Sequence, residues 1–339
     1  MSPTRWHPDR KPKLPQPPPT AIPEPDAMNS SRNASQTRKE LPAKSPATSD
    51  FVNNIIRHLI HLKDQLVSPE LLRDLRITTT RLDFFTGRSS NPRIPALVRL
   101  RDLDALHADL ERVKPWIEEG KDKTSYYYEY RPRYDGVITE HNTAVEENSR
   151  EARYLSQHVY TYIQSAEVRG CPETVLDQTS WLHCIDEPAL QYLGSRTNPK
   201  YLWWVEETYF NYQGRPPQTY AMIPAKHKPH GICQINDSTP FLGDCIRTSE
   251  LQTVALVALS RHLLREYKHL DYFGVTVLSF WDRQVRVVQG LVNFKTNAIE
   301  LRVSPVQSFE TGMRSSPEQY KKFLALLAYF GDAGELPGF

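Results

Sequence analysis

Four side chains that can bind a metal ion lie in or shortly after the stretch TYAMIPAKHKPHGICQIND, which covers residues 219–237. They are His227, His230, Cys233 and Cys245. Nitrogen and sulfur ligands of this kind can complete a tetrahedral zinc site. The spacing His-x-x-His-x-x-Cys matches none of the common zinc-finger patterns, however, and a proline between the two histidines favours a loop. A zinc site and a plain connection between two strands are therefore both open interpretations.

A second group of side chains suits a nucleic acid. The segment SYYYEYRPRYDG, residues 125–136, interleaves aromatic rings with cations, among them Tyr127, Arg131 and Arg133. Stacking on aromatic rings, together with attraction to phosphates, is how proteins hold single-stranded nucleic acids. The alternative is a loop or an edge strand that packs its tyrosines against helices.

The bulk composition narrows the class of protein. The chain has 339 residues and a formal net charge of +2, so no overall charge favours nucleic acid. No apolar run is long enough to span a membrane, and the first residues lack the apolar region of a signal peptide. The four cysteines do not form a dense disulfide framework. We expect an intracellular protein, nuclear or cytoplasmic and not secreted, with reduced thiols; Arg10, Lys11 and Lys13 form a short basic cluster that could direct nuclear import.

The chain divides into three parts by composition. Residues 1–50 are rich in Pro, Ser, Lys and Arg and poor in large apolar residues. Such a segment cannot bury enough surface to offset the entropy of ordering, so we expect a disordered tail. Residues 51–120 are expected to form a helical region, and residues 121–335 an α/β domain.

Hydrophobic periodicity predicts the helices and strands along the whole chain. Apolar residues at three- and four-residue spacing predict helices over residues 51–66, 97–113, 142–170, 249–267 and 316–330. Aromatic and β-branched runs predict strands over residues 201–210, 219–223, 275–281, 284–292 and 298–304. A two-residue turn, Asp282-Arg283, predicts an antiparallel hairpin. This order indicates an α/β (α+β) fold, in which a helical N-terminal part precedes a mixed sheet flanked by helices.

Glycine-rich phosphate loops, dinucleotide fingerprints and nucleophile elbows are absent from the sequence. We therefore expect no small-molecule cofactor. The paired carboxylates Glu206 and Glu207 would point to opposite faces of a strand, so they cannot jointly bind one ion.

The segment DQTSWLHCIDEPALQYL, residues 177–193, resembles part of the fungal PD-(D/E)XK nuclease-like family. The matching positions are Asp177, Trp181, Ile185, Pro188 and Leu190. TYAMIP is similar to the family's strand that carries a catalytic Asp, and GICQIND to the next strand, which carries Glu-x-Lys. ELQTVALVALSRHLL and VTVLSFWDRQVRVVQG resemble its following helix and later hairpin. The resemblance implies a restriction-endonuclease-like core.

The catalytic positions depart from the family pattern. Thr219 stands where the resemblance places the Asp, and Gln234 and Asn236 stand where it places Glu and Lys. Phosphodiester hydrolysis of this type needs carboxylates to hold Mg²⁺, which then lowers the pKa of the attacking water. Neutral side chains give that ion no charge attraction. The resemblance therefore implies a protein that keeps the fold and has lost the catalysis.

Three functions remain open. The first is a catalytically degenerate nuclease-fold protein that acts as a binding or regulatory module, with a nucleic acid or a protein as partner. The second is an active Mg²⁺-dependent hydrolase that uses relocated acids: Glu206, Asp237, Asp244 and Glu250. The third is a helical scaffold whose proline-rich tail recruits partners, as an accessory to a fungal specialised-metabolism gene cluster.

Overall fold

The structure, a computed structural model, describes residues 47–60, 65–91, 95–120, 144–163, 181–183, 194–195, 203–211, 228–264 and 266–336. All of these residues belong to the unit Pro42–Phe339. Most of the proline-rich tail and the aromatic segment 125–136 lie outside the described residues. Among the described helices, none combines the length and the apolar character that a membrane span requires.

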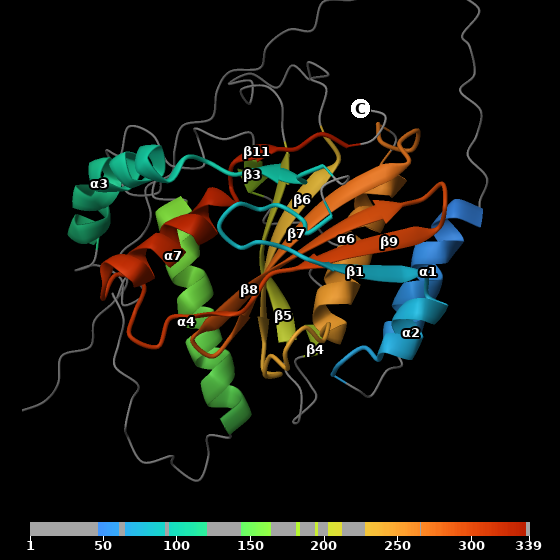
Figure 1. Cartoon of the computed structure of the whole chain (residues 1–339), viewed down its shortest axis with the longest axis horizontal. Helices are drawn as coiled ribbons and strands as arrows, with labels where there is room; N and C mark the ends of the chain where they lie inside the picture. Colours follow the sequence, from blue (N-terminus) through green and yellow to red (C-terminus); the bar gives the residue numbers. More distant parts are fainter. Residues whose placement is uncertain are drawn as a thin grey trace, which may run out of the picture. The chain divides into compact units, whose positions relative to one another are not determined.

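A mixed β-sheet organises the unit (Figure 1). Its strands follow the order β1-β9-β8-β7-β6-β5-β3, with β10 beside β8 and β4 beside β5. The pairs β1–β9 and β6–β7 are parallel, and the other pairs are antiparallel. The strands are β1 Ile77–Arg81, β3 Trp181–His183, β4 Gly194–Ser195, β5 Trp203–Asn211, β6 His230–Asp237, β7 Tyr272–Trp281, β8 Gln284–Asn293, β9 Ala298–Val303 and β10 Gln307–Ser308.

Six helices and one small ribbon surround this sheet within the described residues. The ribbon pairs β2 with β11. The bounds are α1 Ala47–Ile60, α2 Pro69–Asp74, α3 Leu103–Gly120, α4 Ala144–Ile163, α6 Thr248–Leu263, α7 Pro317–Ala328, β2 Val98–Arg99 and β11 Asp332–Ala333.

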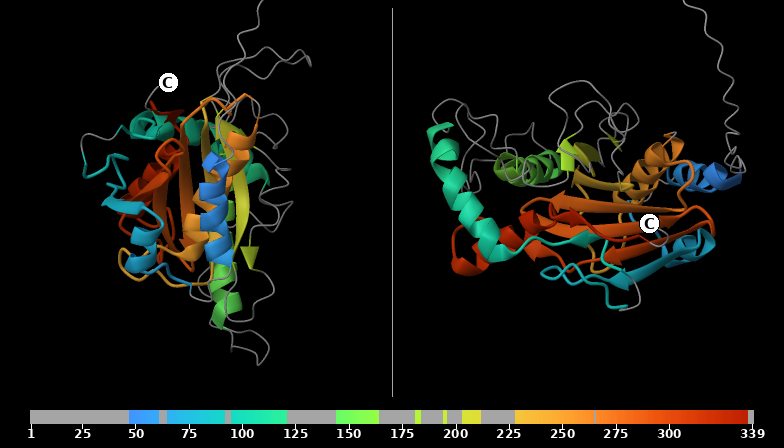
Figure 2. Two further views of the ribbon diagram at one scale, coloured as in Figure 1. Left: turned by 90° about the vertical axis from the view of Figure 1, so that its right-hand side faces the viewer. Right: turned by 90° about the horizontal axis from the view of Figure 1, so that it is seen from above.

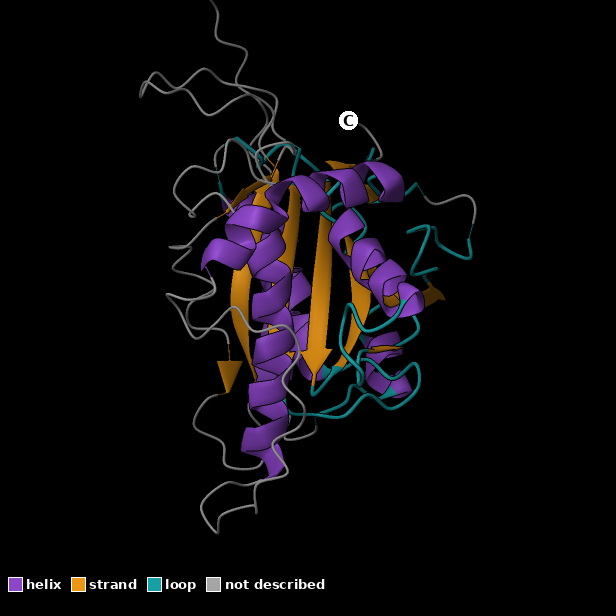
Figure 3. Cartoon of the chain, turned by 90° about the vertical axis from the view of Figure 1, so that its left-hand side faces the viewer, coloured by secondary structure: helices purple, strands orange, loops and turns teal. Residues whose placement is uncertain are grey.

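Alternation along β6 divides the apolar core between the two faces of the sheet, because successive side chains of a strand point to opposite faces. Cys233 and Ile235 join the core formed with α6 and α1, and α1 lies beside α6 (Figure 2). Ile232 joins the core formed with α3, α4 and α7. Figure 3 shows this second helical layer in front of the strands. The sheet therefore carries helices on both faces.

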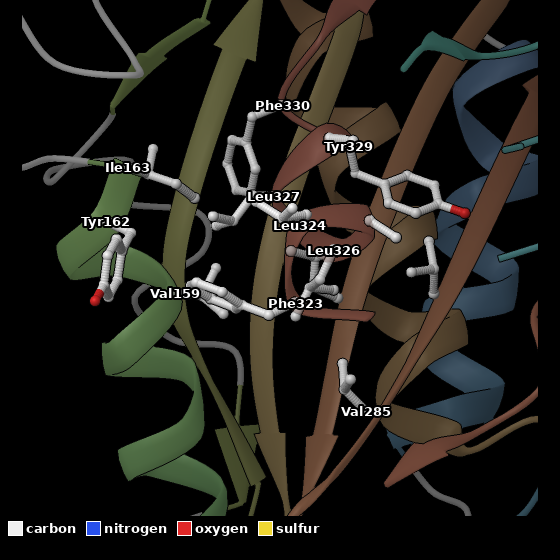
Figure 4. Close-up of a cluster of buried hydrophobic side chains, with 14 of the residues drawn as sticks. Val159, Tyr162, Ile163, Val285, Phe323, Leu324, Leu326, Leu327, Tyr329 and Phe330 are labelled. Carbon is white, nitrogen blue, oxygen red and sulfur yellow. The ribbon is translucent and has the colours of Figure 1, made fainter. Parts of the chain in front are cut away.

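Aromatic and leucine side chains fill the second layer (Figure 4). Phe323 of α7 lies edge-on to Tyr162 of α4, with ring centroids 5.1 Å apart. Tyr209 of β5 meets Phe330 edge-on at 5.0 Å. The whole run Phe323–Phe330 is buried, so α7 is a core helix whose last turns have no solvent face.

The hairpin and the long helix predicted from periodicity are confirmed. β7 and β8 pair antiparallel from Trp281↔Gln284 onward, and Asp282 adopts a positive φ of 49° in the turn. Asparagine and aspartate tolerate this left-handed conformation better than most residues do. The helix predicted over residues 249–267 is α6. An α/β architecture with a mixed sheet is thus present as expected.

The expectation for residues 51–120 needs correction. β1 lies inside this region and pairs in parallel with β9, so the region contributes an edge strand to the main sheet. β2 likewise pairs with β11, near the other end of the described chain. Helical periodicity could not reveal these contacts, because both partners are distant in sequence.

A glycine sets the distance between α6 and the sheet. A Cβ atom added at Gly290 of β8 would overlap the side chain of Val254 of α6. We expect Gly290→Ala to lower the free energy of unfolding by about 1–3 kcal/mol, since a well-packed core resists an added methyl group. Urea denaturation would measure the loss. Adding Val254→Ala should make the double variant less destabilised than the sum of the single variants; simple additivity would contradict this account.

Candidate functional site

A β-bulge on β5 lies next to the two neutral residues of β6 that the resemblance singles out. Trp204 pairs with Asn236 and Val205 with Ile235, but Glu207 then pairs with Gln234, so Glu206 is the extra residue. A bulge of this kind bends the strand and re-aims a side chain. Here it directs the carboxylate of Glu206 toward Asn236 and α4.

Four donors hold the Glu206 carboxylate. Oε1 accepts from Arg153 Nε at 3.2 Å and from Gln157 Nε2 at 3.4 Å, both on α4. Oε2 accepts from Asn236 Nδ2 at 3.1 Å and from the indole Nε1 of Trp204. We call these five residues the Glu206 cluster. A carboxylate has about four lone-pair positions, so this one has none left for a metal ion unless a donor moves away.

Arginine is the donor that matters most for the charge of the cluster. Arg153 neutralises Glu206, whose side chain is only 11 % exposed, while the side chain of Arg153 is 56 % exposed. A divalent cation would have to displace a guanidinium and also meet its repulsion. The local electrostatics therefore oppose metal binding at this carboxylate.

Gln234 lies two residues before Asn236 on the same face of β6, and both are fully buried. Its amide lies near the hydroxyl of Tyr209, whose pKa burial raises well above its ordinary value. The Oδ1 atom of Asn236 is buried without a hydrogen-bond partner in the structure. Gln234 and Asn236, at the positions that the resemblance identifies as catalytic, are thus neutral side chains that point into the protein interior.

Thr219, the third position implied by the resemblance, lies outside the described residues. β6 pairs with β5 along one edge and with β7 along the other. Among the described residues, the acidic side chain that reaches Asn236 comes from β5 and is Glu206. The assignment of Thr219 stays a prediction.

The relocated acidic set does not gather at one point. Glu206 faces α4, whereas Asp237 follows Asn236 on the strand and points to the opposite face, toward the start of α6. Glu250 lies in the first turn of α6 and is fully buried, and Asp244 is exposed in the preceding loop. Only Asp237 and Glu250 share neighbours.

Those neighbours are arginines. Glu250 Oε1 accepts from Arg286 Nε at 2.8 Å and from Arg247 Nε at 3.3 Å, and its Oε2 caps the backbone N–H of Arg247 at 2.9 Å. Asp237 Oδ2 lies 3.8 Å from Arg247 Nε and accepts from the hydroxyl of Ser249. All five side chains are fully buried. We call Asp237, Arg247, Ser249, Glu250 and Arg286 the buried arginine network.

The two carboxyl groups of this network have opposite pKa shifts. Burial opposes ionisation of Glu250, but Arg286 and Arg247 outweigh it and hold the pKa of Glu250 at about 2. Burial raises the pKa of Asp237 above its ordinary value, although Arg247 and Ser249 act in the other direction. Glu250 is therefore the carboxylate of the network that stays ionised, and it neutralises two arginines.

The network shapes the loop between β6 and α6. Arg247 Nη1 donates to Thr239 O at 2.8 Å, and Arg286 Nη2 donates to Cys245 O at 2.7 Å. Both guanidiniums also lie over the ring of Phe241, at 4.0 Å and 4.9 Å from its centroid. The two carboxylates thus neutralise the arginines that hold this loop in place. Because their oxygens accept hydrogen bonds from these neighbours, few lone pairs remain for Mg²⁺.

The candidate zinc ligands do not converge. His230 and Cys233 are an odd number of positions apart on β6, so they point to opposite faces. Cys245 is exposed, and His227 lies outside the described residues. No group of three or more His, Cys, Asp or Glu suited to a metal ion occurs within the described part of the chain. Burial, helped by Lys228, lowers the pKa of His230 to about 3.

Tyr127, Arg131 and Arg133, the residues assigned to nucleic-acid binding, fall outside the described residues. Sequence reasoning missed Arg153, Gln157, Arg247 and Arg286. Arg286 offered a signal, because it interrupts the apolar strand QVRVVQGLV. Its neighbour Val287 is buried as well, so β8 has no solvent face on which an arginine would be ordinary.

Comparison with known proteins gives no match: no family model, no curated protein and no solved structure is similar to this chain.

The opposite pKa shifts predict unequal effects of two isosteric substitutions. Glu250→Gln leaves two buried guanidiniums short of an anion and should lower the free energy of unfolding by about 3 kcal/mol or more. Asp237→Asn should cost clearly less, because the fold already disfavours the charged form. Urea denaturation at neutral pH would compare them.

Acid titration provides a second test of the same network. The folded pKa of Glu250 lies below its ordinary value of 4.5, so its stabilisation is present above that pH and is lost as pH falls toward about 2. Wild-type protein should show this loss, and Glu250→Gln should not. Equal costs for the two substitutions at neutral pH would argue against the assignment of Glu250 as the central anion.

Proposed function

We propose that the chain is a catalytically inactive protein with a restriction-endonuclease-like core, which acts as a binding or regulatory module. The order of helices and strands supports a restriction-endonuclease-like core. Two adjacent strands, β5 and β6, are followed by helix α6, the hairpin β7–β8 and the late helix α7. From β6 to the hairpin, the family resemblance implies the same sequence of elements; the strand that it places before β6 is TYAMIP, which lies outside the described residues. Trp181, the centre of the most specific matching segment, is buried and donates to Gly331 O just after α7.

The main support for catalytic inactivity is that donors already occupy the Glu206 carboxylate. Mg²⁺ loses its water reluctantly and needs anionic oxygens in near-octahedral geometry. At the β5–β6 pair the one carboxylate of the Glu206 cluster is occupied by an arginine and three neutral donors. The other two positions are the amides Gln234 and Asn236. Glu207, the partner of Gln234 across the strands, adds a second carboxylate to this face, contrary to the expectation that Glu206 and Glu207 point to opposite faces. With Glu206 occupied by four donors, the site offers less attraction for a divalent cation than a set of free carboxylates would.

The hydrolase with relocated acids receives less support. Asp237 and Glu250 are fully buried and belong to a network with two arginines, while Glu206 is on the other face of the sheet. A metal at these acids would have to separate buried ion pairs, which is costly. A partner-binding role agrees better with the half-exposed side chain of Arg153, a member of the Glu206 cluster, because an arginine at the surface can bind a phosphate or a carboxylate.

A metal-binding measurement distinguishes a catalytically inactive site from an active one. Wild-type protein should give no Mn²⁺ heat signal in isothermal titration at millimolar metal and no Mg²⁺-dependent cleavage of DNA or RNA. The double variant Arg153→Ala, Gln234→Glu removes the blocking cation and adds a second acidic side chain near Glu206 without placing a new cation beside it. It should gain Mn²⁺ binding, because two carboxylates then face one another.

A matched control uses the same changes together with Glu206→Gln, which should abolish the gained binding. Cleavage by the wild-type protein that disappears in Glu206→Gln would overturn the proposal. Mn²⁺ binding by the wild-type protein that persists in Glu206→Gln but disappears in Asp237→Asn would favour the relocated acidic set.

A further inference from the structure

A row of buried polar side chains crosses the sheet far from the Glu206 cluster. Thr276 of β7 pairs with Gln289 of β8, and Gln289 pairs with Arg302 of β9. Residues that pair across strands share a face, so these three side chains lie side by side. His230 of β6 lies at the end of the row, its ring 2.7 Å from where a Cβ of Gly274 would be. We call these four residues the polar row; six positions along β6, about 20 Å, separate His230 from Asn236.

The polar row is buried but poorly satisfied. Gln289 Nε2 contacts Thr276 Oγ1 at 3.4 Å, and Arg302 donates to Glu300 Oε1 at 2.9 Å and to Pro95 O at 2.7 Å. Gln289 Oε1, Arg302 Nη2 and both ring nitrogens of His230 have no hydrogen-bond partner, and all are buried. Each such group gives up the hydrogen bonds that water would make with it. Four unpaired atoms in one row lower the stability of the closed, buried arrangement at this place.

A thin layer covers this row. It consists of residues 95–99 and 331–336, which include β2 and β11, and we call it the cover. Its apolar contribution is Leu97 and Leu336, which pack on Leu291 of β8 in a cluster of three buried leucines. Leu291 lies two residues after Gln289 on the same face. The other end of this face, by contrast, meets α4 and α7 through a large aromatic and aliphatic core.

Polar contacts hold the cover down, and one of them suggests a ligand class. Lys228 Nζ donates to Ala333 O at 2.9 Å and to Gly334 O at 3.3 Å. The carboxylate of Glu335, itself part of the cover, lies 3.5 Å from Lys228 Nζ and 2.7 Å from Arg99 Nη2. When the cover is away, Lys228 loses these acceptors. An oxyanion of the cover thus occupies a position beside Lys228, next to the His230 end of the row.

We propose that the cover lifts from the sheet and that the polar row beneath it binds a small oxyanion, a phosphate or a carboxylate. Every member of the row can donate: the guanidinium of Arg302, the hydroxyl of Thr276, one imidazole nitrogen of His230, and the Gln289 amide once it is rotated. Lys228 joins them when the cover is open. Within the described part of the chain, Glu300 is the carboxylate paired with the row. With the cover open, Arg302 and Lys228 provide two positive charges against this one negative charge. Lifting exchanges buried unpaired groups for hydrogen bonds to the ligand.

This inference is independent of the function proposed for the Glu206 cluster, since it uses none of the same residues. Hydrogen exchange on the full chain tests it. Amides of the cover should exchange faster than those of β7 and β8. Added inorganic phosphate or acetate should accelerate exchange in the cover, because the ligand binds only the lifted form. Sodium chloride at equal ionic strength should not. The salt that acts distinguishes phosphate from carboxylate.

Two variants of matched charge locate the effect. Arg302→Gln should abolish the acceleration, because it removes the row's guanidinium. Arg99→Gln removes an exposed arginine of the cover that lies outside the row, and the acceleration should remain. An oxyanion that slows exchange in the cover or leaves it unchanged would overturn the proposal, and so would an Arg302→Gln protein that responds as the wild type does.

A third variant opens the cover without altering the row. A Cβ atom at Gly334 would overlap Ala96 O, so Gly334→Ala should displace the two strands of the cover. Affinity for a ligand of a minor state rises as that state becomes populated, so we expect the oxyanion to bind about tenfold more tightly, measured by isothermal titration. Unchanged or weaker binding by a Gly334→Ala protein with native circular dichroism would count against a lifting cover.

Discussion

One carboxylate shared by two buried guanidiniums fixes the junction on which the sheet depends. Glu250 binds Arg247, the N-cap residue of α6, and Arg286 on β8, and it also accepts from the backbone N–H of Arg247. The crossover from β6 through α6 to the parallel strand β7 begins at this point. Removing one partner of such a buried ion pair is strongly destabilising, because the other charge is left buried and unpaired. Here these ion pairs determine where the helix begins and how β6 ends, and so which residues of β6 face each layer.

The two faces of β6 consequently have different chemistry. On one face, Asp237 belongs to the ion pairs that anchor the loop before α6. On the other, Asn236 and Gln234 are buried neutral amides, and Asn236 donates to the fully hydrogen-bonded carboxylate of Glu206. A fold can keep its core after losing charged catalytic groups, because apolar packing on both faces of the strands holds it together. At the Glu206 cluster, Arg153 neutralises the carboxylate; under the proposed function, it takes the place that a metal ion would have in an active site.

Local patterns predicted much of this architecture. The apolar helix α6, the hairpin around Asp282 and the strand β9 all follow from periodicity and turn chemistry. The inward-facing positions Gln234 and Asn236 could also be located. The role of Glu206 could not, because it depends on a bulge and on α4, about fifty residues earlier in the chain. Pairings such as Arg286 with Glu250 likewise join distant segments, and alternation alone cannot identify the partner of a buried arginine.

The edge strand β1 has a consequence for biosynthesis. Its partner β9 follows more than two hundred residues later, since Ile77 pairs with Ile299. During translation β1 therefore emerges long before the strand that completes it, and an unpaired strand is a template for aggregation. Its sequence, ITTTR, places three threonines and an arginine after a single buried isoleucine. Hydrophilic side chains make an unpaired strand a poorer template for aggregation, which is a physical reason for hydroxyl groups at this edge of the sheet.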